Sequence, residues 1–191
     1  MILKPSKKTL QKRKPALFLD RDGVINVDHG YVYTKYKFDF IPGIFDLVRL
    51  AKKAGYLCVV ITNQSGIGRK LYSIAQFRDL SNWMCDVFKE KGGYIDAIYF
   101  SPYHATEGKG KYLKDENTRK PGNGMFVEAI KDLNIDIDNS IMVGDKITDL
   151  KASKSANISK NYLFTNSPKF SKKDLINSQI KVIQNLKEIE L

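Results

Sequence analysis

Cysteine and long hydrophobic runs are both scarce in this 191-residue chain. Its two cysteines, Cys58 and Cys85, lie in apolar stretches, which excludes a disulfide-rich scaffold and indicates buried free thiols. No apolar stretch approaches the roughly 20 residues that span a bilayer, and no apolar segment of about 7–15 residues follows the basic N-terminus. We therefore expect neither a membrane span nor a secretory signal, and we expect the protein to be cytoplasmic.

Acidic residues are fewer than basic ones. The chain has 21 Asp and Glu against 32 Lys and Arg, which gives a formal net charge of +11. A positive surface attracts anions, so phosphorylated substrates and nucleic acid both fit this charge. A dense basic group lies within 1–14 and the remaining charge is mostly scattered lysine. Because no aromatic stacking platform accompanies it, we interpret this charge as a solvated surface that favours anionic substrates, and we do not expect nucleic acid as the partner.

Short apolar runs alternate with longer amphipathic segments along the chain. Continuously apolar strands that alternate with helices are typical of a parallel sheet that is buried on both faces. We therefore predict an α/β fold with a doubly wound, Rossmann-like parallel sheet, helices on both faces and no large cap domain. The predicted strands are 16–19, 57–61, 95–100, 141–143, 162–164 and an edge strand at 180–183, and the predicted helices are 43–54, 73–91, 126–133, 147–156 and one at the C-terminus.

The length of the chain fits one domain. We assign 1–14 to a basic N-terminal tail and 15–191 to a single domain, and we expect a monomer. Ser73 is the predicted N-cap of the long second helix, and Gly55 is predicted to end the first helix. The polar segment 101–121 is predicted to be a loop.

The segment Asp20-Arg21-Asp22-Gly23 directly follows the first predicted strand. Two carboxylates at the end of a buried strand are unfavourable as packing, because buried charge is costly and like charges repel. Such a pair indicates a site where a cation binds and chemistry uses the acids. Gly23 permits a sharp backbone turn with room for a ligand.

A second acidic pair, Asp145 and Asp149, follows the fourth predicted strand. The two are four positions apart and share one face of a helical turn, where helix capping alone would also explain them. The carboxyl ends of parallel strands meet at one edge of the sheet, so we expect these acids to lie beside Asp20 and Asp22. Four carboxylates without histidine or cysteine predict a Mg²⁺ site.

Two further polar segments are expected at the same edge. Thr62 follows the second strand and precedes a glycine-rich turn. The Thr62 hydroxyl and the backbone amides of the turn can hold a phosphate. A lone threonine, however, is also common in strands. Arg119 and Lys120 stand just before Pro121 and a helix start. Such a pair is usually surface charge, but here Lys120 would balance the carboxylates and Arg119 would hold a second anionic or hydroxyl-rich part of a substrate.

This constellation suits phosphoryl transfer, where positioning and charge neutralisation do most of the work. We predict that Asp20 attacks phosphorus and forms an aspartyl-phosphate. Asp22 would protonate the leaving oxygen and then deprotonate the attacking water. Thr62 and Lys120 complete the predicted catalytic set.

Four segments in this order resemble the motifs of the haloacid dehalogenase superfamily of phosphohydrolases. They are Asp20-Arg21-Asp22-Gly23, Thr62, Lys120, and Gly144-Asp145 with Asp149. The match runs over about 16–164, which is most of the chain. The resemblance implies that Mg²⁺ is bound by Asp20, by Asp22 through its backbone carbonyl, and by Asp145. It implies that Asp149 balances charge beside these ligands.

A closer resemblance involves 20–32, 62–67, 119–121 and 144–146, which are similar to the D-glycero-D-manno-heptose 1,7-bisphosphate 7-phosphatase family. It implies a Mg²⁺-dependent phosphatase in the synthesis of nucleotide-activated heptose for surface polysaccharide. In that family the segment after the second strand holds the phosphoryl group, and the other binding residues contact the rest of the substrate. The substrate-binding residues that it implies here are Asp28, His29, Gly30, Tyr31, Asn63, Gln64, Ser65, Arg119 and Lys146.

The chain departs from this family in the 101–121 loop, where many members hold a structural zinc with three cysteines and a histidine. Here the loop contains His104 but no cysteine, so we expect no zinc and a loop that is ordered by its own packing. Two alternative functions stay open. One is a histidinol-phosphate phosphatase, which shares the motifs, and the other is a basic nucleic-acid-binding protein or 3′-end phosphatase, which the net charge favours.

Overall fold

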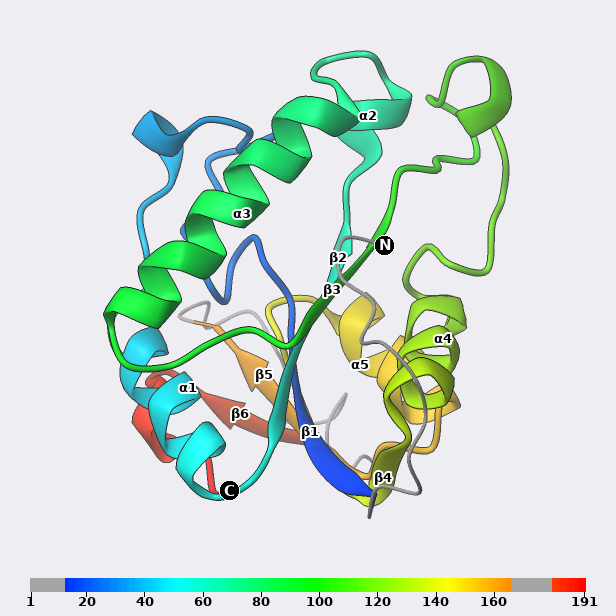
Figure 1. Cartoon of the computed structure of the whole chain (residues 1–191). Coiled ribbons are helices and arrows are strands. Elements are labelled where there is room, and N and C mark those ends of the chain that lie inside the picture. The colour runs from blue at the N-terminus through cyan, green and yellow to red at the C-terminus, as the bar shows by residue number, and fades with distance from the viewer. Residues whose placement is uncertain (1–12, 166–179) are drawn as a thin grey trace.

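The computed structural model describes residues 13–165 and 180–191 of the 191-residue chain. In this part of the chain, six strands form one sheet in the order β3-β2-β1-β4-β5-β6, and every neighbouring pair is parallel (Figure 1). This order is that of the doubly wound fold, which confirms the predicted fold class. The strands are β1 (Lys14–Leu19), β2 (Leu57–Asn63), β3 (Ala97–Ser101), β4 (Ile135–Gly144), β5 (Lys160–Phe164) and β6 (Ile180–Ile183).

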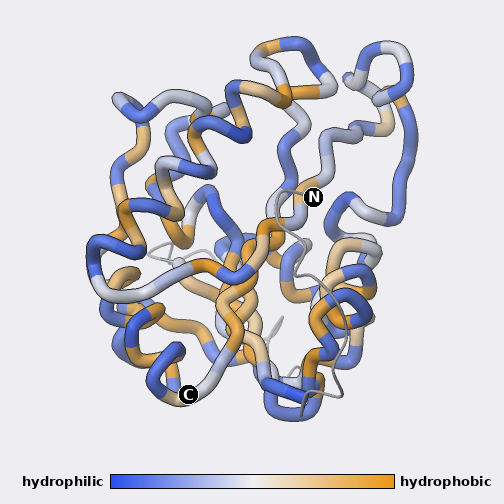
Figure 2. Tube along the Cα trace, viewed as in Figure 1, coloured by the Kyte–Doolittle hydropathy of each residue, from blue (hydrophilic) through white to orange (hydrophobic). Residues whose placement is uncertain are grey.

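Helices cover both faces of the sheet (Figure 1). Helices α1 and α3 pack on one face, and α4 and α5 pack on the other. Successive residues of β1 supply both cores, because Leu17 and Leu19 face α1 and α3 whereas Ala16 and Phe18 face α4 and α5. The strands are therefore apolar along their length, as Figure 2 shows. The helices are α1 (Ile44–Lys53), α2 (Ser65–Gly68), α3 (Ile74–Glu90), α4 (Gly124–Leu133) and α5 (Ile147–Ser155), with short 3₁₀ turns η1 (Lys35–Lys37), η2 (Gly110–Tyr112) and η4 (Leu186–Glu188).

Local sequence signals set the start of α3 and the end of α1. Ser73 Oγ accepts the N–H of Gln76 at 3.1 Å, and the Gln76 side chain accepts the N–H of Ser73 at 2.8 Å. This capping box confirms Ser73 as the N-cap. After α1, Gly55 adopts a left-handed φ of 86°, which glycine accepts readily, so the chain leaves the helix where the sequence predicts.

Strand β4 is longer than the sequence predicts. It begins at Ile135. Its polar residues before Ile141 interrupt the apolar run by which a strand is predicted. The pairing register between β1 and β4 shifts between Pro15 and Leu17. At this irregularity Ser140 Oγ accepts the N–H of Ala16 at 2.9 Å, so a side chain satisfies the buried donor that the ladder leaves unpaired.

Other elements also differ from prediction, and three of these differences concern whole segments. Strand β1 begins at Lys14, inside the segment that we assigned to the tail, because Lys14 pairs with Ile135. The expected C-terminal helix is the single turn η4, and the glycine-rich turn after β2 contains the four-residue α2. The first twelve residues of the predicted tail lie outside the described part of the chain.

Both cysteines are buried and free, as predicted. Among residues 13–165 and 180–191, no helix has the length and apolar character that a membrane span needs. In the same residues the sheet carries no inserted cap domain, and segments 20–43 and 102–123 connect its strands beside the carboxyl ends (Figure 1). Strands β2 and β4 flank β1, so the residues after these three strands share one edge of the sheet.

Candidate active site and metal centre

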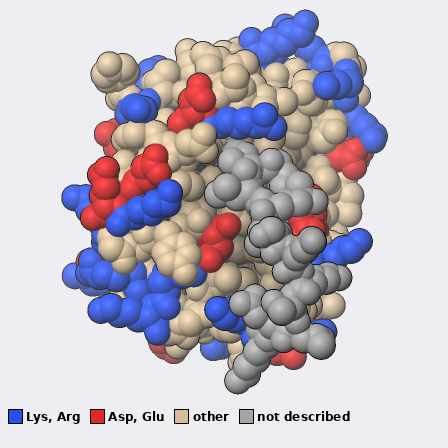
Figure 3. Space-filling view, viewed as in Figure 1, with Lys and Arg blue, Asp and Glu red and all other residues tan. Residues whose placement is uncertain are grey.

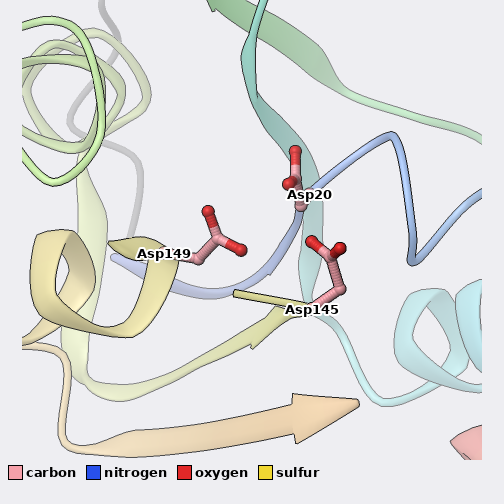
Figure 4. A group of neighbouring side chains, drawn as sticks. All are labelled: Asp20, Asp145 and Asp149. Carbon is pink, nitrogen blue, oxygen red and sulfur yellow. The ribbon is translucent and has the colours of Figure 1, made fainter. Parts of the chain in front are cut away.

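Three carboxylates gather at the predicted edge of the sheet. Asp20 follows β1, Asp145 follows β4 and Asp149 lies in the first turn of α5. Figure 4 shows their side chains turned toward a common space, and one oxygen of each lies within 4.8 Å of the others. The N–H of Asp20 donates to the carbonyl of Val143 at 3.1 Å, so the pairing of β1 with β4 continues up to the site.

Burial dominates the protonation of these acids. It raises the pKa of Asp20 to about 8, against the lowering effect of Lys120 and with neighbouring carboxylates adding to the rise. Burial likewise raises the pKa of Asp145 to about 6, although Lys146 lies close by. The protein's own cations therefore leave the negative charge of this site incompletely compensated, which is the condition that a bound metal ion relieves.

Lys120 is the buried cation of the site. Its ammonium lies 3.0 Å from Asp20 and 2.9 Å from Asp149, and it donates to the carbonyl of Ile61 at 2.8 Å. Burial lowers the pKa of Lys120, but the two carboxylates more than offset this effect, so the pKa is raised and the side chain stays cationic. The second oxygen of Asp149 accepts the N–H of Lys146 at 3.0 Å. Both oxygens of Asp149 are thus engaged by protein donors, and this side chain holds Lys120 in place.

The remaining donors fit Mg²⁺. Asp145 Oδ1 is buried and has no hydrogen-bond partner among the described residues, so it is available to a cation. The acidic cluster offers only carboxylate oxygens, which Mg²⁺ prefers. Gly23 packs directly on Asp145: its φ is +96°, and a Cβ there would lie 2.4 Å from Asp145 Cγ. The turn after β1 therefore requires glycine for Asp145 to keep its place.

Asp22 is not part of this cluster, which corrects the predicted nest of four carboxylates. The guanidinium of the neighbouring Arg21 lies 2.8 Å from both oxygens of Asp22. Asn26 and Gln64 also donate to the Asp22 carboxylate, each at 3.0 Å. The physical reason is the burial of Arg21, which is 1% exposed and needs an anionic partner. Sequence reasoning missed Arg21 and Asn26 because their role depends on the side-chain direction of Asp22.

The last residues of β2 and those that directly follow it contact other parts of the site. Gln64 Nε2 donates to Thr62 Oγ1 at 2.9 Å, and both residues are buried. Asn63 holds the backbone of Lys120, since it donates to the Lys120 carbonyl at 3.1 Å and accepts the Lys120 N–H at 3.0 Å. Ser65 begins α2 at the same edge. The end of β2 therefore fixes both the lysine and the turn after β1.

One ion pair ties the predicted substrate loop to the acidic cluster. Lys146 Nζ lies 3.1 Å from Asp28 and 3.5 Å from Asp145. Burial raises the pKa of Asp28, but Lys146 and a backbone hydrogen bond outweigh it, so the net shift is downward. His29 turns to Asp39, with 2.7 Å between Nε2 and a carboxylate oxygen. The structure thus brings Asp28 and Lys146 together and gives His29 a partner within its own segment.

Two arginines lie near the end of this loop. Gly30 and Tyr31 turn the chain with φ values of 74° and 52°. The guanidinium of Arg69 lies over the Tyr31 ring, 5.6 Å from its centroid, and Arg69 pairs with Glu107. Burial and the nearby Arg69 lower the pKa of Arg119. Arg69 was missed because a single arginine after a glycine-rich turn carries no sequence signal.

Comparisons with known proteins identify a family for this chain. The sequence profile of a family described as "Polynucleotide kinase 3 phosphatase" matches residues 19–188. A D-glycero-beta-D-manno-heptose-1,7-bisphosphate 7-phosphatase from Vibrio cholerae is 49% identical over 145 residues, which make up 76% of this chain and 78% of the relative. A D-glycero-alpha-D-manno-heptose-1,7-bisphosphate 7-phosphatase from Burkholderia mallei is 49% identical over 143 residues, or 75% and 76% of the two chains.

The chain belongs to the heptose bisphosphate phosphatase family. Solved structures share its fold. D,D-heptose 1,7-bisphosphate phosphatase from B. bronchiseptica, complexed with magnesium and phosphate, is 27% identical with a TM-score of 0.78, over 90% of this chain and 93% of that one. A HAD-like phosphatase from Mesorhizobium loti is 32% identical with a TM-score of 0.82, over 97% and 87%. The resemblance that the motifs predicted is confirmed.

In this member of the heptose bisphosphate phosphatase family, the 101–121 loop is ordered by hydrogen bonds. The N–H of Lys109 donates to the carbonyl of Gly68 in α2 at 2.8 Å. His104 Nδ1 accepts the N–H of Glu107 at 3.1 Å, so this histidine closes a turn of the loop. The loop thus contacts α2, the helix that directly follows β2.

We expect the affinity for Mg²⁺ to rise with pH. An ion bound by Asp20 and Asp145 must displace protons, and pKa values of about 8 and about 6 place this competition between about pH 5 and 9. Below these pKa values the protons compete with the ion, so the Mg²⁺ concentration for half-maximal phosphatase activity falls as the pH increases. A titration that gives the same half-saturation throughout this window would contradict the assignment of the ligands.

We expect Gly23→Ala to weaken Mg²⁺ binding by about tenfold or more, because the new Cβ displaces the Asp145 carboxylate. Gly55→Ala is the matched control: Gly55 also has a positive φ of 86°, but a Cβ there meets nothing within 4 Å. Isothermal titration with Mg²⁺ measures both variants. Equal losses in the two would show that backbone strain, and not contact with Asp145, is the cause.

Proposed function

We propose that this protein is a Mg²⁺-dependent phosphatase that removes the 7-phosphate of D-glycero-D-manno-heptose 1,7-bisphosphate. The observation that supports this most directly is the buried Asp20 beside the buried Lys120, at an edge of the sheet lined with carboxylate oxygens. Relatives that are 49% identical bear this enzyme's name. A structural neighbour of that name holds magnesium and phosphate.

Asp20 supplies the nucleophile in this proposal. Its carboxylate oxygen forms a bond to phosphorus as the bond between phosphorus and the substrate's O7 breaks, which leaves an aspartyl-phosphate. Asp22 gives a proton to the departing oxygen. Asp22 then takes a proton from a water molecule whose oxygen attacks phosphorus, and this step releases inorganic phosphate and regenerates Asp20.

Lys120 and Thr62 stabilise the transferring phosphoryl group. The ammonium of Lys120 offsets the charge of Asp20, and the Thr62 hydroxyl donates to a phosphoryl oxygen. Asp20, the backbone carbonyl of Asp22 and Asp145 would hold Mg²⁺, which would supply positive charge to offset that of the phosphoryl group. Asp149 maintains the position of the lysine.

Substrate recognition is proposed for the residues around this centre. Lys146 is half exposed and Arg119 half-buried, and accessible cations near the acidic cluster suit the second phosphate of a bisphosphate. The names of the relatives specify both the β and the α anomer, so both are assayed. The proposed binding residues are Asp28, His29, Gly30, Tyr31, Asn63, Gln64, Ser65, Arg119 and Lys146.

The substrate is tested by comparing specificity constants. We expect kcat/KM for heptose 1,7-bisphosphate to exceed that for histidinol phosphate by more than about a hundredfold, because only the bisphosphate offers a second phosphate to Lys146 and Arg119. Release of inorganic phosphate from each ester, and from both anomers, measures this ratio. A preference of similar size for histidinol phosphate would overturn the substrate assignment and leave the phosphatase chemistry standing.

Asp20→Asn tests the nucleophile. We expect it to lower kcat at least about a thousandfold, since an amide cannot form the acyl phosphate. In the metal-free protein the pKa of Asp20 is raised from 3.8 to about 8, so this group makes folding less favourable as the pH rises between these two values, and the neutral isostere keeps or increases the melting temperature at the upper end of this window. Unchanged turnover in a folded variant would refute covalent catalysis by Asp20.

A 3′-end phosphatase is the second candidate. The description of the matching family and the net charge of +11 favour it. Figure 3 shows lysines and arginines interspersed with acids on the visible face rather than gathered into one basic band. The same assay with a 3′-phosphorylated oligonucleotide decides between the two, with and without residues 1–12. Truncation stops there because Lys14 is part of β1.

We also propose that the protein holds no structural zinc and acts in the cytoplasm. The 101–121 loop has no cysteine, and Cys58 and Cys85 are buried in β2 and α3 as free thiols, which suits a reducing compartment. We expect metal analysis of the purified protein to find less than about 0.1 zinc per chain. One zinc per chain, lost together with thermal stability on chelation, would contradict this. That the protein is a monomer stays a prediction, and analytical ultracentrifugation measures its oligomeric state.

A further inference from the structure

Gln64 joins two groups of the proposed reaction. Its Nε2 donates to Asp22 Oδ2 at 3.0 Å and to Thr62 Oγ1 at 2.9 Å. Its Oε1 accepts from the hydroxyl of Tyr72 at 2.6 Å. Gln64 is 1% exposed, so no solvent replaces these partners. Both ends of one buried amide are therefore paired, with Asp22 and Thr62 on one side and Tyr72 on the other.

The chemistry of these groups fixes the direction of each hydrogen bond. Gln64 presents its NH₂ group to one carboxylate oxygen of Asp22, and the other oxygen accepts from Asn26. The carbonyl oxygen of Gln64 then faces Tyr72, whose hydroxyl must donate. Because Thr62 Oγ1 accepts from Gln64, the Thr62 hydroxyl hydrogen is left to donate elsewhere, which is what a phosphoryl oxygen requires.

Tyr72 is itself held from two sides. Its ring stacks on Tyr33 with centroids 5.2 Å apart and planes at 13°. It also packs on Gly66 in α2, where a Cβ would lie 2.2 Å from Tyr72 Cε1. Burial raises the pKa of Tyr72, so the hydroxyl stays protonated as a donor. The glycine-rich turn therefore makes room for this ring.

We propose that Tyr72 is a positioning residue of the phosphatase reaction. Its hydroxyl orients Gln64, and Gln64 in turn holds the Asp22 carboxylate and directs the Thr62 hydroxyl. The inference rests on the proposed function, because it requires Asp22 to act as acid and base. Without the Tyr72 hydroxyl, Gln64 Oε1 is buried without a donor, and the amide loses the constraint that keeps its NH₂ group on Asp22.

Two aryl phosphates distinguish this role from a structural one. Phenol is a poorer leaving group than p-nitrophenol, so its departure depends more on the proton from Asp22. The two esters are otherwise similar in size and present the same phosphoryl group to Thr62. A displaced Asp22 therefore lowers kcat/KM more for phenyl phosphate, whereas a general loss of structure lowers both values equally.

The experiment compares Tyr72→Phe with a matched control, Tyr99→Phe. Tyr99 is also buried, at 3% exposed, and its hydroxyl donates to Asp132 at 3.4 Å in the core beneath α4 and α5. We expect Tyr72→Phe to lower kcat/KM about tenfold for phenyl phosphate and only about two- to threefold for p-nitrophenyl phosphate, with an unchanged Mg²⁺ half-saturation. Tyr99→Phe leaves the ratio of the two values as in the wild-type protein.

A double variant tests whether Tyr72 acts through Gln64. Gln64→Met keeps the side-chain length and removes the amide, so Tyr72→Phe has no further effect on kcat/KM in that background. Additive losses in the double variant would overturn the inference. Equal losses on both aryl phosphates, or a ratio that Tyr99→Phe changes as much, would also overturn it.

The aryl phosphates separate this inference from the substrate assignment. If the wild-type protein hydrolyses them but not heptose bisphosphate, the substrate proposal fails and the comparison of Tyr72 with Tyr99 still decides the role of Tyr72. If it hydrolyses none of these esters, the phosphatase function fails, and the inference fails with it.

Discussion

A buried lysine between two buried carboxylates is the interaction on which the site depends. Lys120 reaches from the segment before α4 to Asp20 after β1 and to Asp149 in α5, and it donates to the carbonyl of Ile61 in β2. Each of these charges alone would be costly to bury, and removing one partner from such a pair costs about 3–5 kcal/mol. The lysine therefore joins the ends of β1, β2 and β4 into one site, because removing its ammonium would leave Asp20 and Asp149 buried without this cation.

The same charges explain why a cation belongs there. Lys120 pairs with Asp20 and Asp149, and Lys146 lies 3.5 Å from Asp145, yet burial still raises the pKa of both Asp20 and Asp145. A divalent ion bound there would compensate the remaining negative charge and would favour the ionised form of Asp20, as the proposed nucleophile requires. Asp22 stands outside this balance because Arg21 neutralises it. The site thus separates two acids, and the proposed function assigns the ion and phosphorus to Asp20 and the proton exchange to Asp22.

The fold and the positions of the acids could be predicted because each depends on a short stretch of sequence. Apolar strands, the cap at Ser73 and acids placed directly after strands depend on neighbours along the chain, and parallel pairing then brings Asp20 to Asp145. What the sequence did not predict depends on contacts between distant segments. Side-chain packing determines that Asp22 contacts Arg21 and that Tyr72 contacts Gln64. The polar first half of β4 has the composition of a loop, and it forms a strand because it pairs with β1.

The most direct test of the account is a crystal structure of the wild-type protein with Mg²⁺ and beryllium trifluoride, which mimics a phosphoryl group on an aspartate. We expect beryllium bonded to a carboxylate oxygen of Asp20, with Mg²⁺ bound by Asp20 and Asp145 and with Lys120 still between Asp20 and Asp149. Beryllium trifluoride bonded to another residue, or Mg²⁺ bound away from the acidic cluster, would contradict it.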